Sequence, residues 1–234
     1  TGSATPNAAD DELTIGCSWN GTSRAYEFLG SIRDCKVFNV ALDADEIAAY
    51  YNGTMFSYMD YCVCDLPMTI ATHDAVNNRT LDVSGYNNHA TFGDGSTSTT
   101  FPTKLATSAG YSFDGGDYMR TPIIPVAIQS IHMLFYHPPV NTTNRFLWGS
   151  NAAGPTLRFY CYIDNAASGV YKWGLEGTAS ALDLYSSDSV IHSLSFRHNS
   201  ARNYAMSDGR DILVNTASRN TINGFPIFIG SLNN

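Results

Sequence analysis

The stretch that most constrains the fold is residues 110–120, GYSFDGGDYMR. Apolar and polar residues alternate before and after an acidic, glycine-rich break, which indicates one strand that enters a tight turn and another that leaves it. Gly115 and Gly116 supply the positive-φ freedom that the turn needs. Asp114 and Asp117 place two hard oxygen ligands at the corner, so the stretch predicts either a turn closed by aspartate side chains or a calcium corner.

Composition favours a chain of many short strands. The 234 residues include 14 Tyr, 12 Phe and 19 Gly, and a chain of this length can bury the core of one sandwich domain. The net charge of −8 argues against nucleic acid or an anionic membrane surface as a partner. No apolar run approaches the roughly 20 residues of a membrane span, so no span is expected.

The first part of the chain predicts an arm followed by two strands. No signal peptide or initiator Met is present, so we expect the chain as given to be a processed product or a piece of something longer. Residues 1–12 are small, polar and acidic, which is typical of a linker or an extended arm. Strands are predicted at 13–19, LTIGCSW, and at 30–38, GSIRDCKVF.

A short helix is predicted within residues 41–54, ALDADEIAAYYNGT. Asp43 is the expected N-cap, and Glu46 stands three residues later, where it completes a capping box. Asn52 and Gly53 end the helix. The expected apolar face consists of Ile47, Tyr50 and Tyr51.

Five further stretches are informative because of their order. They are LDVSGYNNHATF (81–92), SIHMLFYHPP (130–139), FLWGS (146–150), LSFRHNSARNYAMSDGRDILVN (194–215) and FPIFIGS (225–231). Together with residues 110–120 they resemble the successive strands of laminin-G-like and pentraxin-like domains, which are concanavalin A-type jelly rolls. The resemblance implies an all-β fold, an antiparallel two-sheet β-sandwich, here with one short helix. It does not by itself imply a function.

The closing pieces of such a domain stand at the wrong end of this chain. Residues 28–47 resemble the last strand and the terminal helix of the family, yet they precede the opening pieces. Residues 1–20 also match residues 215–234 at a constant offset, which aligns Ile15 with Ile229 and the glycines that follow them. The chain therefore resembles one period of a repeat that is cut in mid-domain.

The domain organisation follows from this displacement. We expect an arm at 1–12, the closing strands and helix at 13–55, a hinge at 56–65 and the main body of the jelly roll at 66–234. A sandwich that lacks an interior strand leaves backbone groups unpaired at about 1 to 3 kcal/mol each, so the vacancy has to be filled. Residues 13–55 could fold back on their own chain, enter a neighbouring copy, or belong to a window on a tandem array. Filling by a neighbour gives a head-to-tail contact that need not close into a ring, and hence a filament.

The five cysteines are an odd number. Cys62 and Cys64 are too close in an extended strand to pair easily with each other. The resemblance implies that the strands of Cys17 and Cys35 are adjacent and could be joined by a disulfide. Cys161 could then meet Cys62 or Cys64, which leaves one thiol or an intermolecular bridge. The alternative is that all five stay reduced and buried.

Calcium in a structural role is the cofactor that the resemblance implies. In similar domains a turn-rich loop such as 82–89 lies against the acidic corner and binds calcium. The expected ligands are Asp82 and Asp114, helped by Asn87 or a backbone carbonyl, with Asp117 in reserve. Asx side chains also close turns without any metal, so this alternative stays open.

N-x-T sequons occur at Asn20, Asn52, Asn78 and Asn141. Each lies beside a predicted turn or loop, where a glycan could be attached. In a protein secreted by a eukaryote we expect several to carry covalent N-glycans, which would help to keep a surface of low charge soluble. We therefore expect an extracellular or cell-surface location.

Motifs of catalysis are missing from the sequence. Glucanases with this sandwich carry two carboxylates in an E-x-D-x-x-E strand, whereas the Glu residues of this chain stand in no such motif. No G-x-S-x-G, H-E-x-x-H or phosphate loop occurs. Trp148, Tyr171 and Trp173 are expected in the core, although the same rings on a concave face would stack on sugars.

The sequence thus predicts a non-enzymatic, structural glycoprotein of an extracellular fibre or surface layer. Its partners would be copies of itself, arranged head-to-tail so that each completes the sheets of the next. The alternative is a lectin-like module that binds carbohydrate through the calcium corner or a concave aromatic face.

Overall fold

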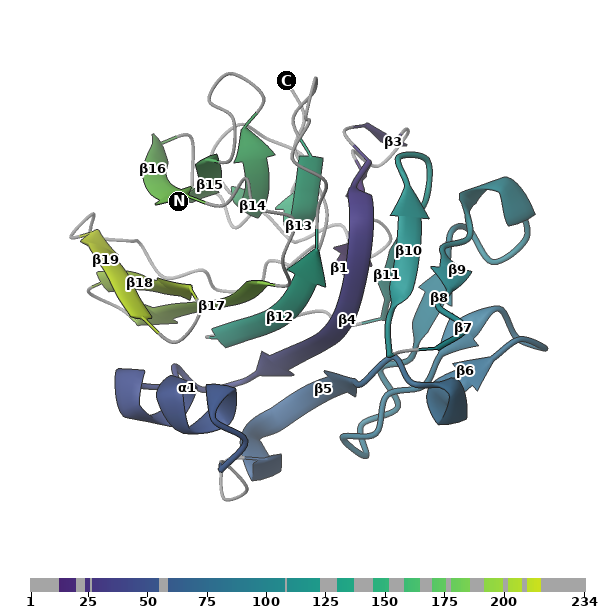
Figure 1. The fold of residues 1–234 in the computed structure, drawn as a ribbon, viewed down its shortest axis with the longest axis horizontal. Coiled ribbons are helices and arrows are strands. Elements are labelled where there is room, and N and C mark those ends of the chain that lie inside the picture. Colours follow the sequence, from purple (N-terminus) through teal and green to yellow (C-terminus); the bar gives the residue numbers. More distant parts are fainter. Residues whose placement is uncertain are drawn as a thin grey trace, which may run out of the picture.

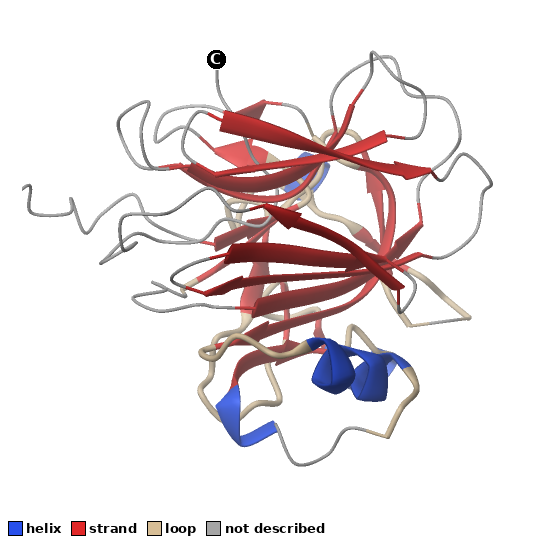
Figure 2. Ribbon diagram, turned by 90° about the vertical axis from the view of Figure 1, so that its left-hand side faces the viewer, coloured by secondary structure: helices blue, strands red, loops and turns tan. Residues whose placement is uncertain are grey.

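The structure is a computed structural model and describes most of the chain. The described residues are 13–19, 24–25, 27–54, 59–107, 109–122, 130–136, 145–151, 158–164, 170–175, 178–185, 192–199, 202–207 and 210–215. They form two large antiparallel sheets and the helix α1 (Ala44–Tyr51). Figure 2 shows the sheets as two layers, with α1 outside one of them. The short 3-10 helices are η1 (Met59–Tyr61), η2 (Ile70–Thr72) and η3 (Ser98–Thr100).

The first sheet has nine strands in the order β16-β15-β14-β13-β1-β11-β8-β7-β6. Its strands are β1 (Leu13–Ile15), β6 (His73–Asp74), β7 (Arg79–Thr80), β8 (Ala90–Phe92), β11 (Met119–Thr121), β13 (Arg145–Asn151), β14 (Arg158–Asp164), β15 (Val170–Leu175) and β16 (Thr178–Tyr185). A row of directly paired, buried residues crosses the middle of this sheet: Phe92, Met119, Ile15, Trp148 and Cys161.

The second sheet has eight strands, seven of them in the order β19-β18-β17-β12-β4-β10-β9. They are β4 (Leu29–Phe38), β9 (Thr103–Lys104), β10 (Tyr111–Asp114), β12 (Ser130–Tyr136), β17 (His192–Asn199), β18 (Arg202–Ser207) and β19 (Arg210–Asn215). The eighth strand, β5 (Cys62–Leu66), pairs with β4 beside β10. A separate ribbon joins β2 (Ser18–Trp19) to β3 (Arg24–Ala25).

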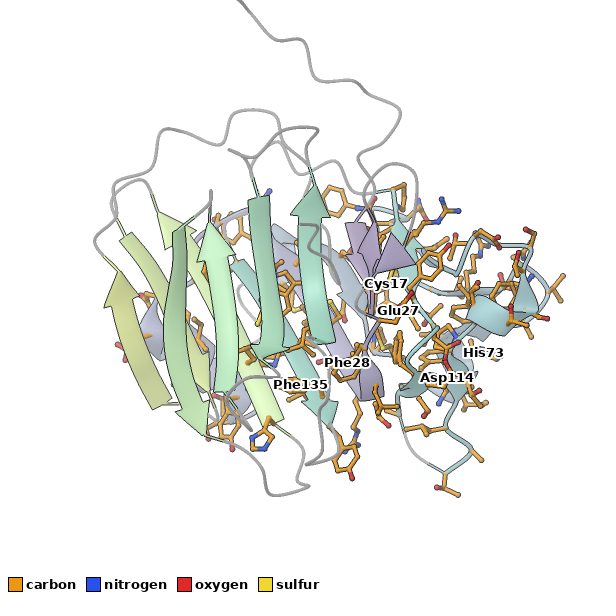
Figure 3. The ribbon with its side chains drawn as sticks, turned by 90° about the horizontal axis from the view of Figure 1, so that it is seen from above. Cys17, Glu27, Phe28, His73, Asp114 and Phe135 are labelled. Atoms are coloured by element: carbon orange, nitrogen blue, oxygen red, sulfur yellow. The ribbon has the colours of Figure 1, made fainter. Side chains whose placement is uncertain are left out.

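The core lies between the two sheets and receives side chains from both. Phe28 is fully buried there, and its ring packs edge-on against Phe113 at 5.9 Å and Phe135 at 6.5 Å between centroids (Figure 3). Such edge-to-face contacts add to the stabilisation from burial. The described residues thus confirm the predicted all-β antiparallel sandwich with an α-helix.

The acidic turn of residues 110–120 joins the two sheets, not two neighbouring strands. β10 pairs with β4 and β9 in one sheet, whereas β11 pairs with β1 and β8 in the other. Gly115 has φ of 95°, a conformation that glycine adopts at no steric cost. Both strands are present as predicted, but the turn between them is an arch across the sandwich.

Helix α1 confirms the predicted capping. The side chain of Asp43 accepts the backbone N–H of Glu46 at 2.8 Å, and the side chain of Glu46 accepts that of Asp43 at 2.6 Å. Asn52 is the C-cap. Ile47 faces the sheet and is buried, but Tyr51 is 48% exposed, so the expected apolar face ends one residue earlier than predicted.

None of the helices that the structure describes is long and apolar enough to cross a bilayer.

Candidate functional site

The candidate site is the seam between residues 13–55, here called the N-terminal segment, and the strands from β5 onward, here called the body. The segment provides β1 to the nine-stranded sheet and β4 to the eight-stranded sheet. Both strands lie in the interior of their sheets (Figure 1). The segment therefore completes both layers of the sandwich in its own chain.

β1 is held on both sides by strands of the body. Ile15 pairs with Met119 of β11 and with Trp148 of β13. The side chain of Ile15 is fully buried. Removing β1 would leave facing edges of β11 and β13 unpaired at the centre of the sheet, which is why this position demands an occupant.

β4 is also held on both sides, and one of its edges is shared. β12 pairs with it from Ser31 to Phe38. On the other edge, β10 pairs with its first half and β5 with its second half. The hinge predicted at 56–65 therefore overlaps β5, which is a paired strand, and residues 55–58 lie outside the described residues.

A row of polar side chains crosses the seam on the outer face of the eight-stranded sheet. Asp65 of β5 pairs with Lys36 of β4, Lys36 with His132 of β12, and His132 with Ser195 of β17. We call Asp65, Lys36, His132 and Ser195 the polar row. All of them are buried, and Tyr50 of α1 lies against Lys36 and His132. Lys36 is the contribution of the N-terminal segment to the row.

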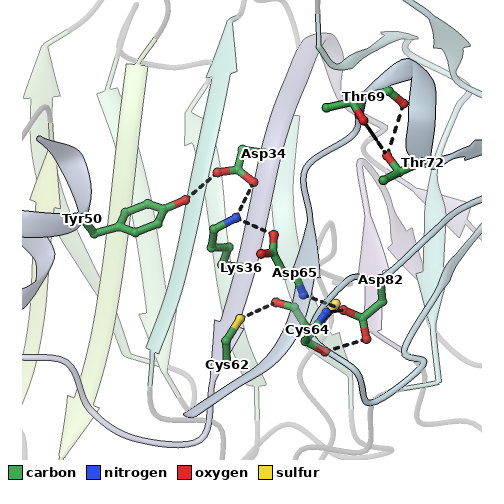
Figure 4. A network of polar contacts seen from close by, with 10 residues as sticks. Asp34, Lys36, Tyr50, Cys62, Cys64, Asp65, Thr69, Thr72 and Asp82 are labelled. Carbon is green, nitrogen blue, oxygen red and sulfur yellow. Dashed lines mark hydrogen bonds and ion pairs between the residues drawn. The ribbon is translucent and has the colours of Figure 1, made fainter. Parts of the chain in front are cut away.

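Lys36 is the centre of an ion-pair network (Figure 4). Its Nζ lies 3.1 Å from Oδ1 of Asp34 and also binds Oδ1 of Asp65. The hydroxyl of Tyr50, on α1, donates to Oδ2 of Asp34 at 2.5 Å. Burial lowers the pKa of Lys36, but the two carboxylates raise it more, so the pKa is higher than usual. The ammonium is therefore charged and fully engaged.

His132 and Ser195 continue the row beneath α1. Nδ1 of His132 lies 2.6 Å from Oγ of Ser195, and the ring of Tyr50 meets the imidazole edge-on at 4.2 Å between centroids. Burial, with a smaller effect of Lys36, lowers the pKa of His132 to about 3, so the ring is neutral at physiological pH. Both side chains are 3% exposed, whereas a catalytic hydroxyl has to reach its substrate.

Ser130 ties the body to the chain that leads into α1. Its Oγ donates to the carbonyl of Val40 and accepts the N–H of Leu42, both at 2.8 Å. Leu42 and Ile47 form a second apolar cluster with Phe38 and Cys62. The helix is thus fastened to the sheet both by contacts across the seam, from Ser130 and Cys62, and by contacts within the N-terminal segment, from Phe38.

The chemistry of the seam suits specific recognition between the segment and the body. A slip of β4 by one residue would turn Lys36 into the core, where its charge would be unpaired. Removing one partner of a buried ion pair costs about 3 to 5 kcal/mol. The polar row therefore stabilises the observed register of β4 and destabilises the registers that are shifted by one residue.

Asp82, a predicted calcium ligand, is engaged by protein donors. Its Oδ1 accepts the N–H groups of Asp65 and Ser84 at 2.8 and 2.9 Å, and its Oδ2 accepts the N–H of Asn88 at 2.8 Å and the hydroxyl of Ser84. The side chain of Asn88 donates to the carbonyl of Val63 at 2.7 Å. The loop thus covers the outer edge of β5, a protection that exposed edge strands need.

The remaining predicted calcium ligands bond within their own turns. Asp117 accepts the N–H of Asp114 at 2.9 Å, and Asp114 accepts the N–H of Gly116 at 2.8 Å. Asn87 is exposed, with φ of 61°. Burial is the main reason that the pKa of Asp117 rises to about 6. In the described part of the chain, no three His, Cys, Asp or Glu side chains are grouped to hold a metal, and calcium binding stays a prediction.

All five cysteines are buried and form no disulfide: Cys17, Cys35, Cys62, Cys64 and Cys161. The implied disulfide between Cys17 and Cys35 is not formed; Cys17 follows β1 in one sheet, and Cys35 lies on β4 in the other. The same separation holds between Cys161 on β14 and Cys64 on β5. Burial raises the pKa of Cys62 to about 12, which keeps this thiol protonated.

Two of the four predicted glycosylation sites can be placed. Asn52 is exposed directly after α1. Asn78 is half-buried, and its Nδ2 donates to the carbonyl of Gly95 at 3.3 Å. Asn20 and Asn141 lie outside the described residues.

Sequence reasoning missed the polar row and placed one aromatic residue correctly. Trp148 is buried in the core as predicted, and nothing is described of the side chains of Tyr171 and Trp173. Asp34 and Lys36 stand two residues apart in a predicted strand, which was a signal for a polar face. Their partners on β5 and β12 could not be found without the strand register.

Comparison of the chain with protein families, with curated proteins and with solved structures gave no match.

Proposed function

We propose that the chain is a structural, non-enzymatic subunit of an extracellular fibre or surface layer, assembled head-to-tail by exchange of the N-terminal segment. The observation that carries the proposal is the interior position of β1 and β4, each flanked on both sides by strands of the body. The N-terminal segment fills a vacancy that would otherwise run through both sheets. We further propose that the sandwich is a circularly shifted laminin-G-like jelly roll.

Exchange between copies would preserve every contact of the seam. The segment of one subunit would meet the same body strands, ion pairs and hydroxyl groups in a neighbour that it meets in its own chain, so little free energy separates the closed and exchanged forms. Because the donor and acceptor surfaces of each subunit differ, the contact is head-to-tail. Unless the rotation between subunits closes a ring, such contacts extend into a filament.

The crossing between subunits would take place after α1. The helix ends at Tyr51 and β5 begins at Cys62, and β5 stays with the body that it belongs to. The residues between these two elements are about ten in number and would span about 30 Å when extended. This supports exchange with an adjacent copy in contact with the donor.

Opposite charges in the polar row allow a direct test of exchange. A chain with Lys36→Asp and a chain with Asp65→Lys should each be destabilised alone, because like charges then face each other on β4 and β5. In a mixture, the Lys36→Asp segment fits the Asp65→Lys body. We expect light scattering after size exclusion to detect a mixed complex that neither variant forms alone.

A second experiment tests the vacancy itself. Deleting residues 1–55 should leave a body that does not fold until a peptide of residues 1–55 is supplied. A stable, soluble monomer after the deletion, or a charge-swap mixture that forms no complex, would refute exchange. Negative-stain images of the intact chain at several concentrations should show polymers that survive dilution.

A lectin-like module is the second candidate, favoured by exposed tyrosine rings. Tyr51, Tyr61 and Tyr86 are 48%, 47% and 56% exposed, and exposed rings can stack on sugars. A monomer that is retained on a polysaccharide column, and released by a calcium chelator, would favour this function over the fibre.

A further inference from the structure

The residue that follows β1 is restricted by the space available to its side chain. Gly16, which follows the strand, has φ of 86°, and a Cβ atom there would lie 2.4 Å from two ring carbons of Phe113. No residue larger than glycine fits at this position. The carbonyl of Gly16 accepts the N–H of Phe28 at 2.6 Å. The position therefore requires a buried apolar residue, Ile15, followed directly by glycine.

The chain contains a second segment that meets this requirement. The Ile-Gly pair occurs twice in the sequence, at Ile15-Gly16 and at Ile229-Gly230. When the two pairs are aligned, Phe228 stands at the position of Thr14. Thr14 is fully buried and pairs with Gly149 of β13, so the larger ring of Phe228 would have to lie over this glycine, an arrangement in which an aromatic residue and a glycine form a favourable cross-strand pair.

We propose that the β1 position between β11 and β13 is a strand-exchange site that accepts residues 227–229 of a second copy in place of Leu13–Ile15. This inference rests on the proposed function in that subunits complete one another's sheets, and it names a second exchanged strand.

β1 is a short strand. It contributes three residues, with three Cα partners on β11 and two on β13. An incoming strand would gain the same backbone hydrogen bonds, as in other cases of β-strand addition.

The test uses the same substitution at the two equivalent positions. Ile15→Ala should weaken the resident strand and favour exchange, so that the concentration for half-assembly falls at least about 30-fold. Ile229→Ala should weaken the incoming strand and raise that concentration by a similar factor. Ile70→Ala is the matched control, because Ile70 is 74% exposed and should leave assembly unchanged.

A labelled peptide keeps the inference testable if Ile15→Ala unfolds the chain. The peptide of residues 221–234 should bind the wild-type chain, and the same peptide with Gly230→Val should not, since its side chain would meet Phe113. Equal behaviour of Ile15→Ala and Ile229→Ala, or equal binding of the two peptides, would overturn the inference. If the charge-swap mixture forms complexes while Ile229→Ala has no effect on assembly, the proposed function stands and this exchange site is refuted. If the charge-swap mixture forms no complex while Ile229→Ala weakens assembly, this exchange site is supported and exchange of the whole N-terminal segment is refuted.

Discussion

Replacement of Lys36 by Met removes the cation of the polar row and leaves two carboxylates buried beside each other. The side chains of Lys36, Asp34 and Asp65 are 11%, 17% and 9% exposed, so water cannot replace the ammonium. Breaking a buried ion pair in this way costs about 3 to 5 kcal/mol. For a chain of this length, each kcal/mol lowers Tm by about 2 to 4 °C, and we expect a loss of about 6 to 20 °C.

The measurement is thermal unfolding followed by circular dichroism at pH 7. Arg79→Met is the matched control, because Arg79 pairs with Asp74 at 2.9 Å but is 34% exposed, and surface pairs contribute about 0 to 1 kcal/mol. The triple variant Asp34→Asn, Lys36→Met, Asp65→Asn should recover most of the loss, since no buried charge remains.

The loss should also depend on pH. Burial already raises the pKa of Asp65, and Lys36 opposes that rise; without Lys36 the pKa of Asp65 rises further, so the folded state binds a proton at pH values where the unfolded chain has released it. The destabilisation should therefore shrink as pH falls from 7 toward 4. A Tm of the Lys36→Met variant within about 2 °C of the wild type would refute the argument that the network depends on its cation.

Three further predictions concern the turns, the sheet edge and the glycan. Burial raises the pKa of Asp117 to about 6, so its contribution to stability is present below about pH 4 and is lost as pH rises through 6; Asp117→Asn, which can still accept the N–H of Asp114, should flatten the stability profile in that range. Asp82→Ala leaves the buried N–H of Asp65 unpaired and should cost about 1 to 3 kcal/mol, with faster aggregation by light scattering because the edge of β5 opens. Asn52→Gln, expressed in a secreting eukaryotic cell, should run faster on a gel by the shift expected for the loss of one glycan. Unchanged mobility would refute glycosylation of Asn52.

Local signals in the sequence were sufficient for most elements of the fold. Alternation predicted β4, β10 and β12, and the capping box of Asp43 and Glu46 predicted α1, because these patterns depend on neighbours within a few residues. The arch at Gly115 was not distinguishable from a hairpin, since both need a glycine between two alternating strands.

The site was less predictable than the fold because it depends on register between distant strands. Lys36 meets His132 only because β4 pairs with β12, and no local pattern encodes that pairing. Asp82 shows a second limit, since a carboxylate in a turn suits either calcium or backbone N–H groups. The bonds to Asp65 and Asn88 became visible only with the three-dimensional arrangement.

The pairing of the first strands with late ones has a consequence for synthesis on the ribosome. Ile15 pairs with Trp148, and Ser31 with Tyr136. At about 5 to 20 residues per second, β12 emerges roughly 5 to 20 s after β4 does. β5 emerges earlier and pairs with part of one edge of β4, but throughout that interval the edge that β12 will occupy has no mate in the nascent chain and is open to a strand of another copy.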